Sequence, residues 1–215
     1  MFTVKSLVCN PLQENCYIVS DERGECVIID CGIYYEEECY ALKHYISEQR
    51  LKPVHLLATH GHLDHNFGNR EIFREYGLKA EACQEDEYLI AHLPEQATHL
   101  FGMQIPEDQP EVGRWLAHHD TVRFGHHVLE VLQTPGHSPG SCIFYCEEEH
   151  TAFTGDTLFR MSVGRTDLDG GSWQQMEKSM RDVVARLPKD TVVLPGHGPK
   201  TLIADELQYN PYLRF

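Results

Sequence analysis

The stretch Thr59–His65, with the sequence THGHLDH, constrains this chain more than any other. It follows residues 54–58, a short apolar run of the kind that forms a buried strand. Imidazole nitrogen and carboxylate oxygen are ligand atoms that zinc and similar divalent ions accept. His60 and His62 lie two positions apart, so in extended chain they point the same way, whereas the closing Asp-His pair comes after a glycine turn. One stretch can therefore serve two metal ions.

The same arrangement recurs three times further along the chain. Each time an apolar strand-like run ends in a turn that contains Gly or Pro, and one ligand-type residue follows: His137 after residues 128–132, Asp156 after 152–154, and His197 after 192–194. Glycine permits sharp turns, and proline ends a strand. A histidine pair can arise by chance in a chain with 14 histidines. Four strand ends that each deliver metal-type donors instead favour a metal site at one rim of the fold.

These residues resemble the metallo-β-lactamase superfamily, and most closely its glyoxalase II-like (hydroxyacylglutathione hydrolase-like) branch. The THGHLDH motif followed by His137, Asp156 and His197 carries the likeness to the superfamily. GDTLF at residues 155–159 and GRTD at 164–167 are similar to the short single-domain hydrolases of that branch. The resemblance extends from the first hairpin to His197. It implies an α/β fold, a four-layer αββα sandwich of two facing mixed sheets flanked by helices, with the site at the open edge between the sheets.

The resemblance also assigns the ligands. His60, His62 and His137 would hold one ion, Asp64, His65 and His197 would hold the other, and Asp156 would bridge them. Two divalent ions can share a hydroxide that attacks a carbonyl carbon, while both ions stabilise the developing oxyanion. Asp64, the expected catalytic residue, would orient that hydroxide through its second oxygen. Zinc is the expected metal, and iron or manganese would also fit the donor set.

The implied activity is hydrolysis of a thioester, either a hydroxyacylglutathione or a related acyl thiol. Glutathione itself is left open, because the sequence runs only about eighteen residues past His197, whereas glyoxalase II carries a helical domain there that supplies much of its glutathione-binding surface. One alternative is a persulfide dioxygenase-like enzyme, which shares the GRTD motif and uses a single iron. A β-lactamase is disfavoured by GDTLF and GRTD. An alternative of another class is a metal-stabilised binding protein without catalysis.

Two further residues near the expected ligands are candidates for substrate contact. Arg165 would bind a substrate carboxylate, or it would pair with Asp167 and fix the loop beside Asp156. Phe159 would form part of the wall of the site. Asp30, at the end of another strand-like run, would either orient a ligating histidine or bond loop amides.

The rest of the chain predicts one domain, residues 1–215, whose hydrophobic content of 41% is enough for a substantial core. Helices are expected at residues 36–49, 66–76, 85–92 and 173–187, and from 202 onward. Ser172 is the expected N-cap of the fourth of these. Residues 85–114 are expected to form a lid-like insertion with little regular structure beyond Pro94.

The formal charge of −15 disfavours binding to nucleic acid or to an anionic membrane surface, because both need clustered Lys and Arg. There is no basic-then-apolar leader and no apolar run of membrane-spanning length, so we expect a cytoplasmic protein with a small-molecule substrate. The eight cysteines are therefore expected to be free thiols. The sequence does not indicate an oligomeric state.

Overall fold

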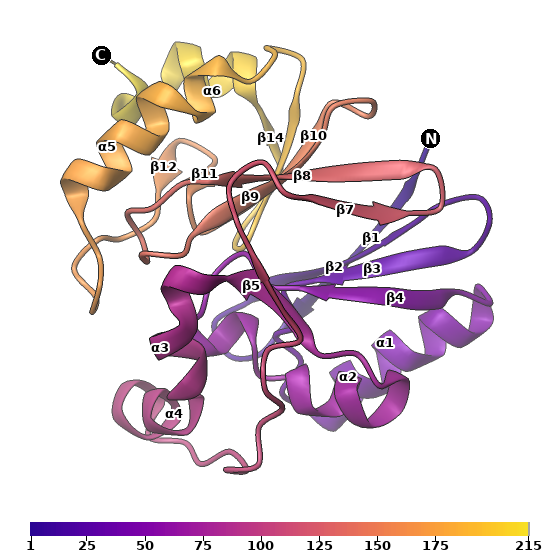
Figure 1. Cartoon of the computed structure of the whole chain (residues 1–215). Coiled ribbons are helices and arrows are strands. Elements are labelled where there is room, and N and C mark those ends of the chain that lie inside the picture. Colours follow the sequence, from indigo (N-terminus) through magenta and orange to yellow (C-terminus); the bar gives the residue numbers. More distant parts are fainter. Residues whose placement is uncertain (215) are drawn as a thin grey trace.

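Two six-stranded sheets face each other at the centre of the molecule (Figure 1). The computed structural model describes residues 1–214, and for Phe101 the backbone alone. The first sheet contains, in spatial order, β1 (Thr3–Cys9), β2 (Glu14–Ser20), β3 (Glu25–Ile29), β4 (Lys52–Leu57), β5 (Ala80–Cys83) and β6 (Arg114–Leu116). The second contains β14 (Thr201–Leu202), β13 (Val192–Pro195), β10 (Thr151–Gly155), β9 (Cys142–Cys146), β8 (His127–Gln133) and β7 (Thr121–Phe124). A separate small hairpin is formed by β11 (Leu158–Phe159) and β12 (Ser162–Val163).

Helices cover the outer faces of both sheets. Figure 1 shows α1 (Glu36–Glu48) and α2 (Asn69–Tyr76) on the first sheet, and α5 (Trp173–Asp182) and α6 (Ile203–Tyr209) on the second. Near one end of the sandwich lie α3 (Glu87–Ala91) and α4 (Leu93–Phe101). Short 3-10 turns are η1 (Leu63–His65), η2 (Gln84–Asp86), η3 (Val184–Arg186) and η4 (Pro211–Leu213). The predicted four-layer αββα architecture is therefore confirmed.

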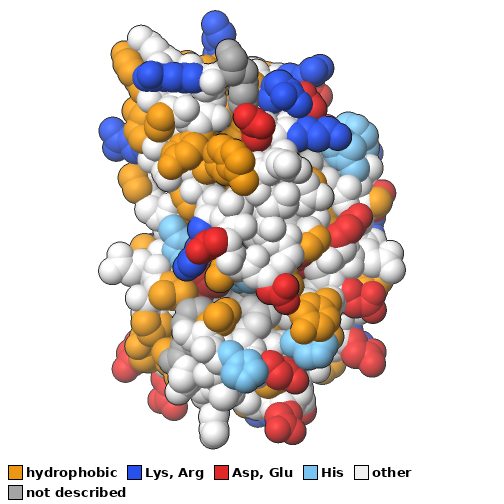
Figure 2. All heavy atoms as spheres, turned by 90° about the vertical axis from the view of Figure 1, so that its left-hand side faces the viewer, with side chains coloured by type: hydrophobic (Ala, Val, Ile, Leu, Met, Phe, Trp, Pro, Cys, Tyr) orange, Lys and Arg blue, Asp and Glu red, His pale blue; other side chains and the backbone are white. Residues whose placement is uncertain are grey.

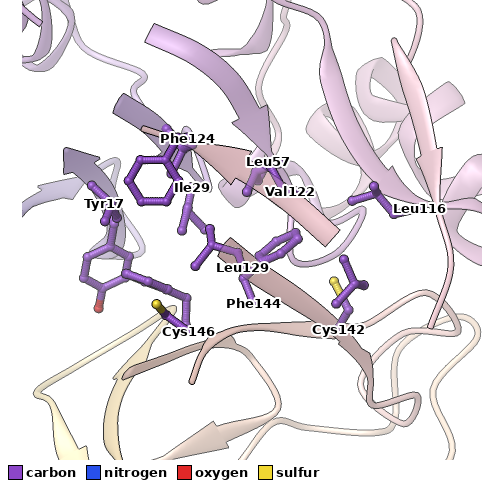
Figure 3. Packing of buried hydrophobic residues seen from close by; sticks show 14 of the residues in the cluster. Tyr17, Ile29, Leu57, Leu116, Val122, Phe124, Leu129, Cys142, Phe144 and Cys146 are labelled. Carbon is purple, nitrogen blue, oxygen red and sulfur yellow. The ribbon is translucent and has the colours of Figure 1, made fainter. Parts of the chain in front are cut away.

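The main core lies between the two sheets. Figure 3 shows apolar side chains from both sheets meeting there, among them Tyr17, Ile29, Leu57, Val122, Phe124, Leu129 and Phe144. In β3, Val27 and Ile29 point into this core, while Ile28 points outward and packs with Leu42 of α1. Because helices cover the outer faces, the central strands are buried on both sides and read as continuous apolar runs. This explains why the strand preceding each ligand can be recognised from sequence.

Strand direction brings the expected ligands to one edge of each sheet. In the first sheet, β4 lies parallel to β3 and β5, and its carboxyl end leads into Thr59–His65. In the second sheet, β10 and β13 are parallel, and β8 is antiparallel to β9, which is antiparallel to β10. The carboxyl ends of β8, β10 and β13 therefore share one edge, and His137, Asp156 and His197 follow them in the chain.

The expected helices are present, but their bounds differ in places. α5 ends at Asp182, and the 3-10 turn η3 follows it where one helix was expected up to residue 187. α2 begins at Asn69 rather than at residue 66, because residues 66–68 form a turn in which the Asn66 side chain bonds the loop after β4 and Gly68 N donates to the Cys31 carbonyl oxygen. The expectation of little regular structure beyond Pro94 was wrong for residues up to 101, which form α4, and is confirmed for residues 102–113. Pro94 lies in the first turn of α4, where its missing N–H costs no intrahelical hydrogen bond. As expected, Ser172 caps α5, and its side chain accepts a hydrogen bond from the backbone of Gln175.

The cysteines are free thiols in the structure, as expected, and all but Cys39 are buried. Within residues 1–214, the structure contains no helix that is both long and apolar enough to cross a membrane.

Candidate metal centre

The loop Thr59–His65 is held in place by buried polar side chains. Asp30 accepts hydrogen bonds from Thr59 N and Oγ1, both at 2.7 Å. Asn66 Nδ2 donates to the carbonyl oxygens of His60 (3.0 Å) and His62 (2.7 Å). Because these bonds fix the main chain, the side chains of the loop project in set directions.

A first cluster consists of His60, His62 and His137, which each offer a ring nitrogen within 4.8 Å of the others. His62 Nδ1 lies 2.8 Å from His137 Nε2. The other nitrogen of His137, Nδ1, donates to the carbonyl oxygen of Arg165 at 2.7 Å. That donation fixes the tautomer and leaves the Nε2 lone pair directed into the cluster. His60 Nδ1 lies 3.0 Å from Thr59 Oγ1, so its Nε2 is likewise the nitrogen that faces the cluster.

A second cluster consists of Asp64, His65 and His197. Asp64 Oδ2 lies 3.2 Å from His197 Nε2 and 3.6 Å from His65 Nε2. The outer nitrogens of both rings again have acceptors: His65 Nδ1 lies 3.0 Å from Asp30 Oδ2, and His197 Nδ1 lies 3.1 Å from the Leu12 carbonyl oxygen. Asp30 therefore fills both roles considered for it, since it bonds the loop amide and orients a histidine.

Asp156 lies between the two clusters. Its Oδ2 is 3.5 Å from His137 Nε2 and 3.7 Å from His197 Nε2, while its Oδ1 is 3.4 Å from His65 Nε2. One carboxylate thus faces donors of both clusters, as a bridging ligand must. Gly196 makes room for it, because a Cβ at that position would clash with Asp156 Oδ1.

The two clusters differ in their electrostatics. Burial and the neighbouring histidines lower the pKa of His60 well below its usual value and that of His62 to about 4, so both rings are neutral near pH 7. Burial also works against a charge on His65, but the carboxylates around it raise its pKa. Burial opposes the ionised form of Asp156, yet the adjacent imidazoles lower its pKa. The rings of His60 and His62 are therefore already in the neutral form that binds metal, whereas a cation in the second cluster would have to displace the proton that the carboxylates favour on His65.

The donor set fits divalent cations. His60 Nε2, His65 Nε2 and Asp156 Oδ1 are buried and make no hydrogen bond among the described residues. Buried polar atoms normally have a partner, since leaving one unpaired costs free energy. A cation in each cluster would satisfy these atoms, and five imidazoles with two carboxylates match the ligand types of zinc and iron. The structure thus brings together all seven side chains proposed as ligands, and their role as ligands remains our proposal.

Asp86, which joins the loops of the first cluster, was missed at the level of sequence. It is fully buried and accepts from Gly61 N (2.7 Å), Gly140 N (2.6 Å) and Ser138 Oγ (2.6 Å). Gly61 lies between the first two histidines of the cluster, and Ser138 follows the third. Two of the three hydrogen-bond partners of Asp86 are backbone N–H groups, and such partners leave no pattern in the sequence. Asn66 was also missed, although a short amide directly after a turn is a recognisable sign of local bonding.

The clusters lie along a cavity of about 500 Å³. Its wall includes both residues proposed for substrate contact, Arg165 and Phe159. The Arg165 guanidinium forms two hydrogen bonds to Asp167, from Nε to Oδ1 at 2.7 Å and from Nη2 to Oδ2 at 2.8 Å. The structure therefore contains the arginine–aspartate pair, and the Arg165 carbonyl orients His137. α4 forms another part of the wall through Gln96 and Leu100.

Gln96 also fixes α4 against the loop that carries the first cluster. Its Oε1 accepts from Leu63 N, and its Nε2 donates to the Gly61 carbonyl oxygen, each at 3.1 Å. Residues 85–114 therefore form an ordered part of the cavity wall through α4.

Comparison with known proteins gives concordant matches. The family model described as Metallo-beta-lactamase superfamily matches residues 9–197. Hydroxyacylglutathione hydrolase GloC of Haemophilus influenzae is 34% identical over 203 residues, which cover 94% of this chain and 93% of that protein. Among solved structures, BLEG-1 B3 metallo-beta-lactamase has a TM-score of 0.90 and 31% identity, covering 99% of this chain and 100% of that one. TTHA1623 in a di-iron-bound form has a TM-score of 0.86 and 34% identity, covering 97% and 100%.

Proposed function

This chain belongs to the metallo-β-lactamase superfamily, and on that premise we propose that it is a metal-dependent hydrolase that cleaves a thioester, of the hydroxyacylglutathione type or of a related acyl thiol. The observation that carries the proposal is the convergence of histidine and aspartate side chains from both sheets beside one cavity, with donor atoms of three of them buried and without a hydrogen bond. The likeness to GloC supports the thioester as the bond that is cleaved.

The residues divide into three roles. His60, His62 and His137 would hold one ion, Asp64, His65 and His197 the other, and Asp156 would contact both. Bound there, two divalent ions would lower the pKa of water and polarise a carbonyl oxygen. Zinc is the proposed metal, and the di-iron form of TTHA1623 makes iron the next candidate.

Asp64 is the proposed catalytic residue. Its Oδ2 faces the imidazoles of His65 and His197, which leaves Oδ1 to accept a hydrogen bond from the attacking water. A carboxylate in that position orients the water and holds its proton.

The cavity wall favours a leaving group that departs as an anion. Of the described residues that line this cavity, the titratable ones are the proposed ligands and Arg165. Arg165 stays charged and is bonded to Asp167, so it cannot protonate a departing atom. A thiol has a pKa near 8.5 and can leave as thiolate, whereas an amine must be protonated. Thioesters are therefore favoured over amides as the substrate.

A second candidate is hydrolysis of a β-lactam amide, which the likeness to BLEG-1 favours. It would require that Asp64 pass the proton taken from the water to the leaving nitrogen, because Arg165 stays charged and cannot donate it, whereas a thiolate leaves without that step. A persulfide dioxygenase-like enzyme and a metal-stabilised binding protein without catalysis are two further candidates, and each predicts a different result in the assays that follow.

The test measures S-lactoylglutathione hydrolysis, cephalosporin hydrolysis and oxygen uptake with glutathione persulfide on the same metal-loaded preparation. We expect thioester hydrolysis, reduced by roughly 10²–10⁴-fold in Asp64→Ala with the fold retained. Asp190→Ala is the control, because Asp190 pairs with His150 on the surface and should leave turnover unchanged. Turnover confined to the cephalosporin would indicate a β-lactamase, and turnover confined to oxygen uptake would indicate a dioxygenase. Inactivity in all three assays would favour the binding protein.

A further inference from the structure

A second cavity continues from the first toward α3 and α4. It has a volume of about 280 Å³. Four residues line both cavities: His62, Gln96, Leu100 and Leu168. The two cavities therefore adjoin, and we refer to both together as the groove, from the proposed metal ligands along α4. A substrate whose reacting carbonyl lies at the ligands would place the rest of its length in this second cavity.

The far part of the groove is lined by rings and carboxylates. The rings of Tyr88 and His92 are in contact, with centroids 4.3 Å apart and planes tilted by 35°, and His92 Nδ1 donates to the Tyr88 carbonyl oxygen at 2.7 Å. His99 lines the same cavity, together with the acidic side chains of Glu95 and Asp169. His92 is half-buried and His99 is exposed, and both line this cavity.

Positive side chains are scarce along the groove. Among the described residues, Arg165 is the one Lys or Arg side chain that lines either cavity, and its fork of donors is bonded to Asp167. Figure 2 shows the face of the molecule that includes this end of the sandwich. Most Lys and Arg atoms gather at the top of that view, whereas most Asp and Glu atoms lie in the lower half.

The acidic side chains of the groove determine which charge a bound substrate can carry there. A carboxylate on the substrate arm would meet Glu95 and Asp169 without a free cation to balance it, and like charges placed together in a binding site disfavour the complex. An amide, a hydroxyl or an ammonium on that arm would find acceptors in the same carboxylates and partners in the imidazoles. Apolar parts of the arm would pack against Leu100 and Leu168.

We propose that this groove binds the arm of a thioester that carries no carboxylate, so that uncharged or cationic acyl thiols react faster than glutathione thioesters. The inference rests on the proposed thioesterase function and specifies the substrate class of the same site. The arm lies along α4, with its polar groups at Glu95 and Asp169.

The experiment compares two probes that differ in charge and hardly in size: S-lactoylglutathione, and the same ester with both carboxylates converted to primary amides. We expect kcat/KM to be about five- to thirtyfold higher for the diamide, which is the effect of one or two close like-charge pairs in water. The difference should shrink when salt is raised from about 0.1 M to about 1 M, because the screening length falls from about 10 Å to about 3 Å.

A double variant, Glu95→Gln with Asp169→Asn, locates the effect. It should bring the kcat/KM ratio of the two probes to within about twofold of unity. The matched control is Glu147→Gln with Glu148→Gln, which changes the charge equally in the turn before β10, at the end of that strand opposite Asp156. The control should keep the wild-type ratio.

The outcomes separate the two claims. Faster turnover of S-lactoylglutathione than of the diamide, or a ratio that the double variant leaves unchanged, would overturn the inference and leave the thioesterase function standing. Failure of the wild type to hydrolyse either probe would overturn the proposed function and the inference with it.

Discussion

Replacing Asp86 by asparagine tests whether one buried carboxylate positions the first cluster. Asp86 Oδ2 accepts from Gly61 N and Ser138 Oγ, and Oδ1 accepts from Gly140 N, at 2.6–2.7 Å. Gly61 belongs to the loop of the first two histidines, and Ser138 follows the third. Asparagine keeps the size of the side chain but turns one acceptor oxygen into an NH2 group, so one of these bonds must be lost.

The expected loss of unfolding free energy follows from those three hydrogen bonds. If the amide oxygen faces Gly61 and Ser138, the NH2 group faces the Gly140 N–H, and a buried donor without an acceptor costs about 1–3 kcal/mol. Burial raises the pKa of Asp86, so removing its charge recovers part of that loss. We expect a net cost of about 2 kcal/mol, which lowers Tm by roughly 4–8 °C in a chain of this size. Affinity for the ion of the first cluster should fall about 10- to 100-fold.

The assay is competition for the metal with a chelator of known affinity, paired with thermal unfolding. Asp21→Ala is the control, because it removes Oδ1, which accepts two backbone hydrogen bonds at 3.0 Å in the β2–β3 turn, away from the centre. The control should lower Tm and leave metal affinity unchanged. Wild-type metal affinity in Asp86→Asn would refute the positioning role. An unchanged Tm would refute the hydrogen-bond reasoning as well.

Two further predictions address crowding and charge. Gly196→Ala should reduce the metal content by about one ion per chain. The added Cβ would clash with Asp156 Oδ1 and lie 2.6 Å from His65 Cε1. Metal analysis that finds two ions per chain in this variant would contradict the prediction. His55→Gln should cost more stability at about pH 6 than at about pH 9, measured by urea unfolding. A hydrogen bond to Glu81 raises the pKa of His55, so its contribution is complete below the unfolded pKa and is lost as pH rises through the folded one; equal losses at both pH values would refute this.

Local features of the sequence were enough to predict the ends of the strands and the ligand candidates. Each ligand follows a buried strand within a few residues, and glycines and prolines mark the turns, so the relevant information is contiguous. The αββα architecture required the family resemblance, because alternation of apolar residues does not reveal which strands pair. In β3, for example, Ile28 faces α1 while its neighbours face the other sheet.

The contacts that support the centre could not be predicted in the same way. Asp86 lies 25 residues from Gly61 and 54 from Gly140, and its contacts depend on how the two sheets pack. α4 was missed because Pro94 suggests a helix break, although proline is accepted in a first helical turn. The helix then places Gln96 against the ligand loop, a tertiary contact that the sequence of the helix alone does not indicate.

The proposed activity requires above all that the seven converging side chains bind two cations. Anomalous diffraction from crystals grown with zinc tests this directly. We predict two peaks per chain, one bonded to His60, His62 and His137, the other bonded to Asp64, His65 and His197, with Asp156 contacting both. A single peak, or peaks located away from these atoms, would contradict the two-ion centre.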